Sequence, residues 1–139
     1  MGNRARRVGL LLGICVLAAA LAPAASQAPD PKKVLAQEQL GLARQALSDL
    51  EELHKHGEVA SYDPSFAVWE RRQVEAIRDA GASRAEFIVA LEGYVKRLRD
   101  RQRIVEEGYR RAQVPRVDAY DAKYRVLEAE MWLSQEKAR

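Results

Sequence analysis

Two runs of residues spaced alternately three and four positions apart occupy the C-terminal half of the chain, one on each side of Pro115. Heptad spacing of this kind places a run on one face of an α-helix and predicts a helix that packs along that face. Proline lacks an amide hydrogen and restricts the residue before it, so neither helix can continue through Pro115. The first run is Ile88, Leu91, Val95, Leu98, Gln102, Val105, Tyr109 and Ala112, and the second is Val117, Tyr120, Tyr124, Leu127, Met131, Ser134 and Ala138.

The two runs together predict an antiparallel helical hairpin over residues 84–139, with coiled-coil-like packing along the seams. Two helices alone cannot bury enough apolar surface to offset the entropy of ordering them, so earlier helices or a second chain must cover the rest. Two shorter helices are predicted before the hairpin, from about Lys33 to His56 and from Pro64 to about Asp79. No strand pattern is present, so we expect an all-α helical domain over residues 34–139.

Residues that favour helix ends separate these segments. Gly57 predicts the end of the first helix, because glycine readily takes the left-handed conformation that closes a helix. Asp63 followed by Pro64 predicts the start of the second helix, with Asp63 as its cap. Ser83 with Glu86 three residues later predicts a capping box at the start of the third helix.

The N-terminal segment has the pattern of a secretory signal peptide over residues 1–28. A positively charged head precedes an uncharged apolar run over residues 8–21, and small residues follow that run. A linker is expected over residues 29–33. We therefore expect export, with the processed protein in the periplasm or associated with the cell envelope. The positive charges of the head are Arg4, Arg6 and Arg7.

This segment allows two other interpretations. An uncleaved membrane anchor is the alternative to cleavage, although the apolar run is shorter than the roughly 20 residues that span a bilayer. Lipid attachment at Cys15 is disfavoured, because Ile14 stands where a lipoprotein signal has a small residue. Cleavage would remove Cys15, which is the only cysteine, so no disulfide is expected in the processed chain.

The charge balance argues against nucleic-acid binding. The whole chain carries 23 basic and 20 acidic residues, a formal net charge of +3. The predicted signal peptide contains three of the basic residues and no acidic one, so the remainder is neutral. A nucleic-acid-binding protein usually carries a marked basic excess.

A basic run from Lys96 to Arg103 could instead contact anionic lipids, but acidic residues are interleaved with it, which favours a solvated helix face.

The residues around Pro115 resemble the hairpin repeat of TolC-like outer-membrane efflux proteins. The resemblance rests on the segment from Tyr109 to Asp118 and on the alanine- and leucine-spaced helix that follows. The segment from Trp69 to Arg139 is also similar to small exported bacterial helical proteins. The resemblance implies a hairpin-like packing unit and an envelope location. The usual turn glycine of the family corresponds to Ala112, and the chain is too short to form the membrane barrel of a channel.

The candidate metal ligands are His54 and His56, which cluster with Glu51, Glu52 and Glu58 at the end of the first predicted helix. Imidazole is a good ligand for zinc or copper. However, two residues two positions apart point to different sides of a helix, and only a frayed helix end would let both rings converge. The competing interpretation is a pair of histidines near a helix C-terminus, where positive charge is favourable. The alternative function is that of a small periplasmic helical bundle that binds a metal ion or a small ligand.

Catalysis has little support in the sequence, and an enzyme stays a formal third hypothesis whose distinguishing feature would be a buried pair of carboxylates. No serine lies in a nucleophile-elbow motif and no glycine-rich phosphate loop is present. No cofactor is expected. The leading hypothesis is a non-enzymatic exported protein that acts by helix-to-helix association, either with itself or with a protein partner. The residues expected to form the association seam are Leu91, Leu98, Val105, Tyr109, Tyr120, Tyr124, Leu127 and Met131.

Overall fold

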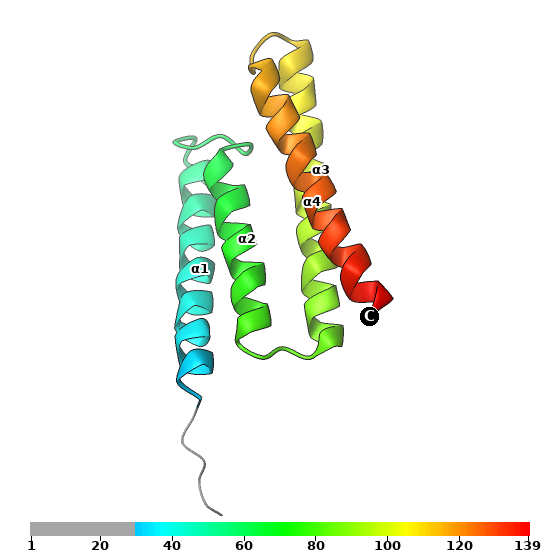
Figure 1. The fold of residues 1–139 in the computed structure, drawn as a ribbon. Helices are drawn as coiled ribbons and strands as arrows, with labels where there is room; N and C mark the ends of the chain where they lie inside the picture. The colour runs from blue at the N-terminus through cyan, green and yellow to red at the C-terminus, as the bar shows by residue number, and fades with distance from the viewer. Residues whose placement is uncertain (1–29) are drawn as a thin grey trace, which may run out of the picture.

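The computed structural model describes residues 30–139, and the expected signal peptide over residues 1–28 lies outside this range. Within it the protein is all-helical and contains no strand, which confirms the expected fold class at this level. Figure 1 shows the course of the chain through its helices. They are α1 (Pro31–Lys55), α2 (Pro64–Asp79), α3 (Arg84–Arg110) and α4 (Arg116–Ala138).

The first helix begins earlier and is longer than expected. Asp30 caps it by accepting a hydrogen bond from the Lys32 amide at 3.0 Å, and Pro31 occupies the first turn. Part of the expected linker over residues 29–33 is therefore helical. At 25 residues α1 exceeds the 23 residues of α4, so the expectation of two shorter N-terminal helices is wrong for α1. The same Asp-Pro signal starts α2, and the predicted start of that helix at Pro64 is confirmed.

The other helix starts agree with the sequence signals. The Asp63 carboxylate accepts a hydrogen bond from the Ser65 amide at 2.8 Å, as an N-cap does. Ser83 and Glu86 form the expected capping box, because each side chain accepts from the backbone amide of the other residue. Hydrogen bonding to Ser83 lowers the pKa of Glu86.

The turn between α3 and α4 places an alanine in a conformation that favours glycine. Ala112 has φ = 57°, the left-handed value that Gly57 and Gly81 adopt at the ends of α1 and α2. The amide of Ala112 bonds to the carbonyl of Tyr109, and the next amide bonds to the carbonyl of Gly108, both at 2.9 Å. This is a Schellman closure formed without glycine, and its cost is about 1–2 kcal/mol.

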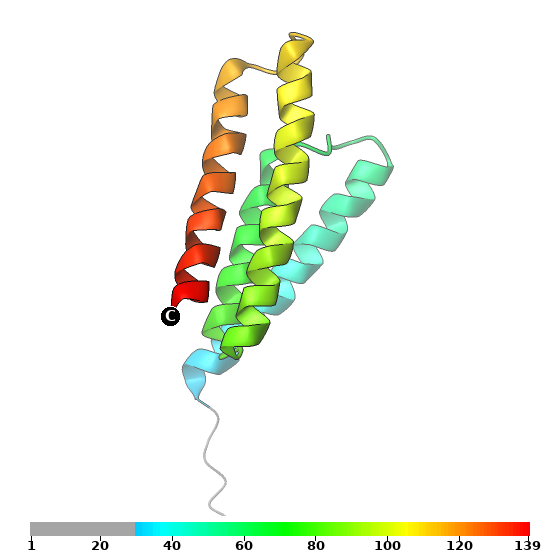
Figure 2. The ribbon, with the colours of Figure 1, turned by 90° about the vertical axis from the view of Figure 1, so that its right-hand side faces the viewer.

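The four helices pack in chain order, α1 on α2, α2 on α3 and α3 on α4. Successive helices run in opposite directions, and α1 lies on the outer side of α2 (Figures 1 and 2). The turn that joins α3 to α4 extends beyond the loop that joins α1 to α2 in both views. The helices of residues 30–139 thus form an open array in which each helix packs mainly on its neighbours in the chain.

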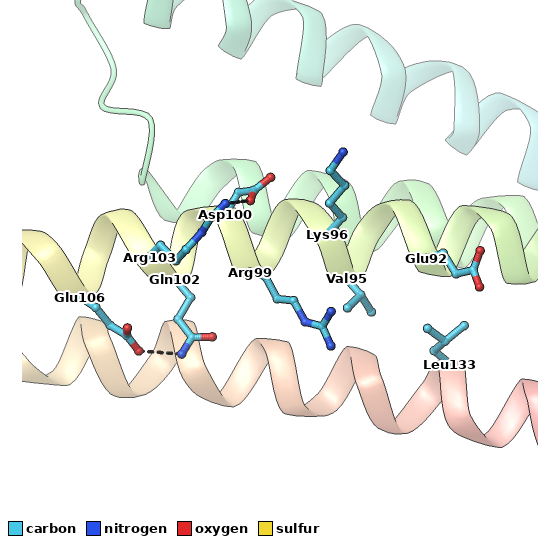
Figure 3. A pocket seen from close by; sticks show the side chains of 9 residues that line it. All are labelled: Glu92, Val95, Lys96, Arg99, Asp100, Gln102, Arg103, Glu106 and Leu133. Atoms are coloured by element: carbon cyan, nitrogen blue, oxygen red, sulfur yellow. Dashed lines mark hydrogen bonds and ion pairs between the residues drawn. The ribbon is translucent and has the colours of Figure 1, made fainter.

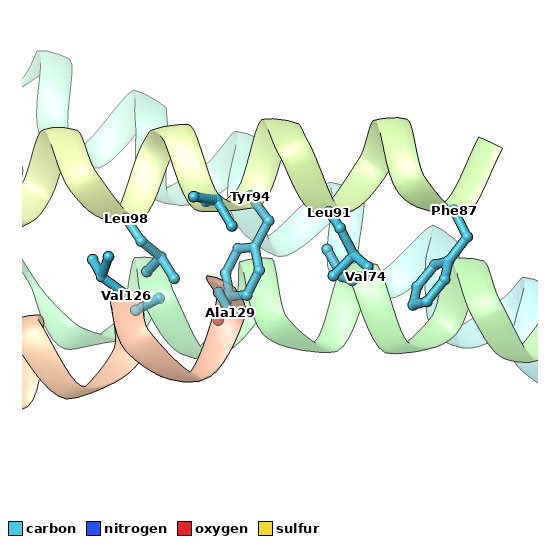
Figure 4. Close-up of a cluster of buried hydrophobic side chains, with 9 residues drawn as sticks. Val74, Phe87, Leu91, Tyr94, Leu98, Val126 and Ala129 are labelled. Atoms are coloured by element: carbon cyan, nitrogen blue, oxygen red, sulfur yellow. The ribbon is translucent and has the colours of Figure 1, made fainter. Parts of the chain in front are cut away.

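The core lies between α2, α3 and α4 (Figure 4). Leu91 is fully buried at its centre, and Tyr94 is 2% exposed. Burial raises the pKa of the Tyr94 hydroxyl to about 12, since the charged phenolate is poorly solvated there. No helix in residues 30–139 is long and apolar enough to cross a membrane. The buried cluster consists of Ala67, Val74, Phe87, Leu91, Tyr94, Val95, Leu98, Val126 and Ala129.

Candidate functional site

One face of α4 carries a row of exposed apolar and aromatic side chains, which we call the α4 stripe. Its members are between 53% and 66% exposed. Single exposed apolar residues are common on folded proteins, but a row of large ones along one helix face is typical of an interaction surface. The α4 stripe consists of Val117, Tyr120, Tyr124, Leu127 and Met131.

The position of the α4 stripe corrects the sequence prediction for this helix. The heptad run of α4 was expected to pack against α3, but α4 buries Val126 and Ala129 instead, at 5% and 1% exposure. Leu133 packs beside them at the edge of the core. The helix has two apolar faces, and the face with Ala129 allows a closer approach to α3 than a face of tyrosines. Heptad spacing alone cannot distinguish two such faces.

The residues predicted for the association seam are therefore divided between two places. Leu91, Leu98 and Val105 are buried in the core or beside it, as the expected packing of α3 requires. Tyr109, near the end of α3, is 42% exposed. The α4 members of the seam, Tyr120, Tyr124, Leu127 and Met131, are all exposed.

Polar contacts between α3 and α4 are compatible with only the rotation of α4 that exposes its stripe. The guanidinium of Arg99 pairs with Glu130 at 2.6 Å, and Lys137 pairs with Glu92 at 2.6 Å. Near the end of α4, Arg84 donates to the carbonyl of Glu136 at 2.9 Å. These contacts lie in the half of the α3–α4 interface away from the connecting turn, and turning the stripe inward would break all of them.

A buried carboxylate joins α2 to α3, and sequence reasoning did not anticipate it. Glu70 is 3% exposed and accepts a hydrogen bond from Arg97 at 2.8 Å and one from Arg101 at 2.9 Å. Arg101 also lies over the ring of Phe66, 4.9 Å from its centre. The signal that could have identified the cluster is Glu70 on the apolar side of an otherwise amphipathic helix.

Arg71 of α2 links α2 to α4 through an ion pair and a stacking contact. It donates to Glu75 of its own helix and to Glu128 of α4, each at 3.0 Å. Its guanidinium also lies 4.9 Å from the centre of the Trp132 ring, which belongs to α4. The hydrogen bond to Glu75 raises the pKa of Arg71. This residue therefore holds α4 against α2 by charge and by stacking.

A shallow groove of about 520 Å³ runs along the outer face of α3 (Figure 3). Asp100 pairs with Arg103, and Glu106 accepts a hydrogen bond from Gln102 at 2.7 Å. Acids and bases alternate along the groove, so it presents no surface of a single charge to a polyanion. Most cations of the basic run from Lys96 to Arg103 are thus paired with carboxylates. Two of those carboxylates, Glu70 and Glu130, lie on the neighbouring helices α2 and α4. The lining residues are Glu92, Val95, Lys96, Arg99, Asp100, Gln102, Arg103, Glu106 and Leu133.

The two histidines do not converge. His54 lies in the last turn of α1 and its Nδ1 is 2.9 Å from the carbonyl oxygen of Val59, while its ring meets Phe66 edge-on at 6.4 Å. His56 follows the helix as its exposed C-cap residue. Among residues 30–139 no group of three or more His, Cys, Asp or Glu side chains is placed to hold a metal ion. The positions of both histidines agree with the interpretation that they lie near a helix C-terminus, where positive charge is favourable.

No protein family model, curated protein or solved structure matches this chain.

Proposed function

We propose that this chain is an exported, non-enzymatic protein that acts in the cell envelope by helix-to-helix association through the α4 stripe. The observation that carries the proposal is a helix already packed on its α3-facing side that still exposes five apolar and aromatic residues on another. Burying such a row contributes about 25 cal/mol per Å² of apolar surface, which favours a second helix over water.

The charged residues of the interior support a packing role rather than a chemical one. Glu70 is 3% exposed and ion-paired with two arginines, so it is closed to a substrate. Tyr94 retains its proton far above neutral pH because it is buried. A general acid or base requires a pKa near the working pH and access to substrate, and neither residue offers both.

The remaining parts of the proposal rest on the sequence. The charged head, apolar run and small residues of segment 1–28 support export. The resemblance of the Tyr109–Asp118 segment to TolC-like repeats supports an envelope location and a hairpin of α3 and α4 as the working unit. In this proposal the heptad spacing of α4 serves a coiled-coil-like contact with a partner, not the contact with α3.

Site-specific photo-crosslinking in cells tests the proposal. The chain is expressed from Met1 with a photoreactive amino acid in place of Tyr124, which is 66% exposed, or in place of Val89, which is 67% exposed and lies on α3. We expect a discrete adduct from position 124, lost when Leu127→Glu is added, and none from position 89. Equal adducts from both positions, or none from position 124, would contradict an association role for the α4 stripe.

A further inference from the structure

We infer that the partner of the α4 stripe is a second copy of this chain, packed with its α4 parallel to the first and in the same register. This inference rests on the proposed function, since it names the occupant of the same surface. Three features support it: the spacing of the stripe, the charges along its two edges and the preformed helix that carries it.

The spacing of the stripe matches the core of a two-stranded parallel coiled coil. Val117, Tyr124 and Met131 are seven residues apart, and Tyr120, Leu127 and Ser134 form the second set, three residues after each of them. In heptad notation the first set occupies position a and the second position d. In a parallel pair each of these residues meets its own copy across a two-fold axis along the helices.

The charges along the edges of the stripe select the parallel orientation. In a parallel pair the residue directly before each position a is at position g. It faces the position e residue of the other helix, whose number is higher by five. Arg116 would then face Asp121 of the second copy, and Lys123 would face Glu128 of the second copy. Each contact occurs twice by symmetry. Arg116 and Lys123 form no ion pair within residues 30–139. Asp121 is already paired with Arg125 and Glu128 with Arg71, so in the dimer each carboxylate would be shared between a cation of its own chain and one of the second copy.

The antiparallel alternative places like charges together. Matching Tyr120 to Met131 in opposite directions gives three edge contacts. Arg116 faces Lys137 and Asp121 faces Glu128, which are like charges, whereas Lys123 faces Glu130, which is an opposite charge. Like charges at facing positions destabilise a helix pair and are a known means of excluding a wrong orientation. The charges along the edges of the stripe are thus complementary in the parallel pair and mostly repulsive in the antiparallel pair.

The size of the stripe predicts a weak, reversible dimer. One helical face buries less than the roughly 800 Å² per partner of a standard stable interface. On the other hand α4 is already folded against α3, so association does not have to offset the entropy of forming the helix. Tyr120 and Tyr124 bring rigid rings with few rotatable bonds, which lowers the entropic cost further. We expect a dissociation constant on the order of micromolar.

Cysteine crosslinking of purified protein tests the pairing and its direction. Ser134→Cys, in a Cys15→Ser background, introduces one nearly isosteric cysteine at a d position and leaves the α4 stripe intact. In a parallel dimer the two copies of this cysteine face each other, so mild oxidation should produce a covalent dimer. The matched control is Ser48→Cys on α1, which is also exposed and should remain monomeric.

The direction of pairing is tested independently by Arg116→Glu. In the parallel dimer this change sets Glu against Asp121 of the second copy and should weaken dimerisation by about tenfold. In an antiparallel dimer it would face Lys137 and strengthen dimerisation. A crosslink that forms only between Ser134→Cys and Val117→Cys proteins, or stronger dimerisation of Arg116→Glu, would overturn the parallel arrangement.

The outcomes separate this inference from the function on which it rests. If purified protein stays monomeric at 100 times the expected dissociation constant while Tyr124 still crosslinks specifically in cells, the partner is another protein and only the self-association is overturned. A monomer that binds anionic lipid vesicles, and loses that binding with Leu127→Glu, would assign the stripe to a membrane surface and overturn both.

Discussion

Glu70 of α2 and Arg101 of α3 form a two-point contact in the interior, with both carboxylate oxygens accepting from the guanidinium and one of them at 2.9 Å. Arg101 has an 18% exposed side chain, whereas Arg97, the second cation on Glu70, is 44% exposed. The pair therefore sets how α2 and α3 align. Because α2 contacts α1, α3 and, through Arg71, α4, this alignment affects the whole domain.

Glu70→Ala should lower the free energy of unfolding by about 2–3 kcal/mol. The change leaves Arg101 partly buried without its counter-ion, while Arg97 can turn toward water and limits the loss. Urea denaturation measures the effect. Glu130→Ala, which removes the partner of the exposed Arg99, is the control and should cost less than about 1 kcal/mol. Equal losses would mean that burial adds nothing to the Glu70 contact.

Ala112→Gly should stabilise the protein by about 0.5–1 kcal/mol. Ala112 has φ = 57°, where its Cβ is strained and glycine is not. Glycine also gains entropy in the unfolded chain, which offsets part of the relief. Thermal unfolding measures the change, with Ala119→Gly inside α4 as a control that should destabilise by about 1 kcal/mol. A destabilised Ala112→Gly protein would contradict the left-handed turn.

Gly108→Ala should destabilise the turn region by about 1–3 kcal/mol, since the added Cβ would lie 2.6 Å from Cγ2 of Val114. Adding Val114→Ala should recover part of the loss by making room. Gly41 in α1 is the matched control, because a Cβ there meets no atom within 4 Å. Gly41→Ala should instead stabilise the helix by roughly 0.5–1 kcal/mol. Similar effects at both glycines would refute the close contact.

Stability should fall between about pH 10 and pH 12, partly because of Tyr94. The fold raises the pKa of Tyr94 to about 12, whereas the phenol of an unfolded chain titrates near 10. Below pH 10 both states hold the proton and burial carries no penalty. Above it the unfolded state releases the proton first, so unfolding becomes easier by up to about 2 kcal/mol.

Tyr94→Phe removes this contribution and should flatten the alkaline decline in the free energy of unfolding, measured by urea titrations at each pH. Tyr62→Phe, in the α1–α2 loop, is the control because Tyr62 is 40% exposed. An alkaline decline that is unchanged by Tyr94→Phe would show that another group is responsible.

Much of the secondary structure could be predicted because its signals are local. A capping carboxylate before proline, a capping box and a glycine after a helix each depend on a few neighbouring residues. Asp63, Ser83 and Gly57 were interpreted correctly for that reason. Asp30 and Pro31 carry the same signal at the start of α1, where the sequence analysis instead predicts a linker over residues 29–33.

The contacts between helices could not be derived in the same way. The rotation of α4 depends on which of two apolar faces approaches α3 more closely, and on ion pairs such as that of Arg99 with Glu130. The burial of Glu70 depends on arginines about 30 positions later in the chain. Periodicity identifies a helix and its faces, but the choice between faces is made by partners far away in sequence.

Sedimentation equilibrium of the purified protein across a range of micromolar concentrations tests the central claim most directly. We predict a reversible monomer–dimer equilibrium for the parent and for Val89→Glu, which alters an equally exposed apolar residue outside the α4 stripe. Leu127→Glu, with an unchanged helical circular dichroism spectrum, should be monomeric throughout. Equal dimerisation of Leu127→Glu and the parent would contradict the assignment of the α4 stripe as the association surface.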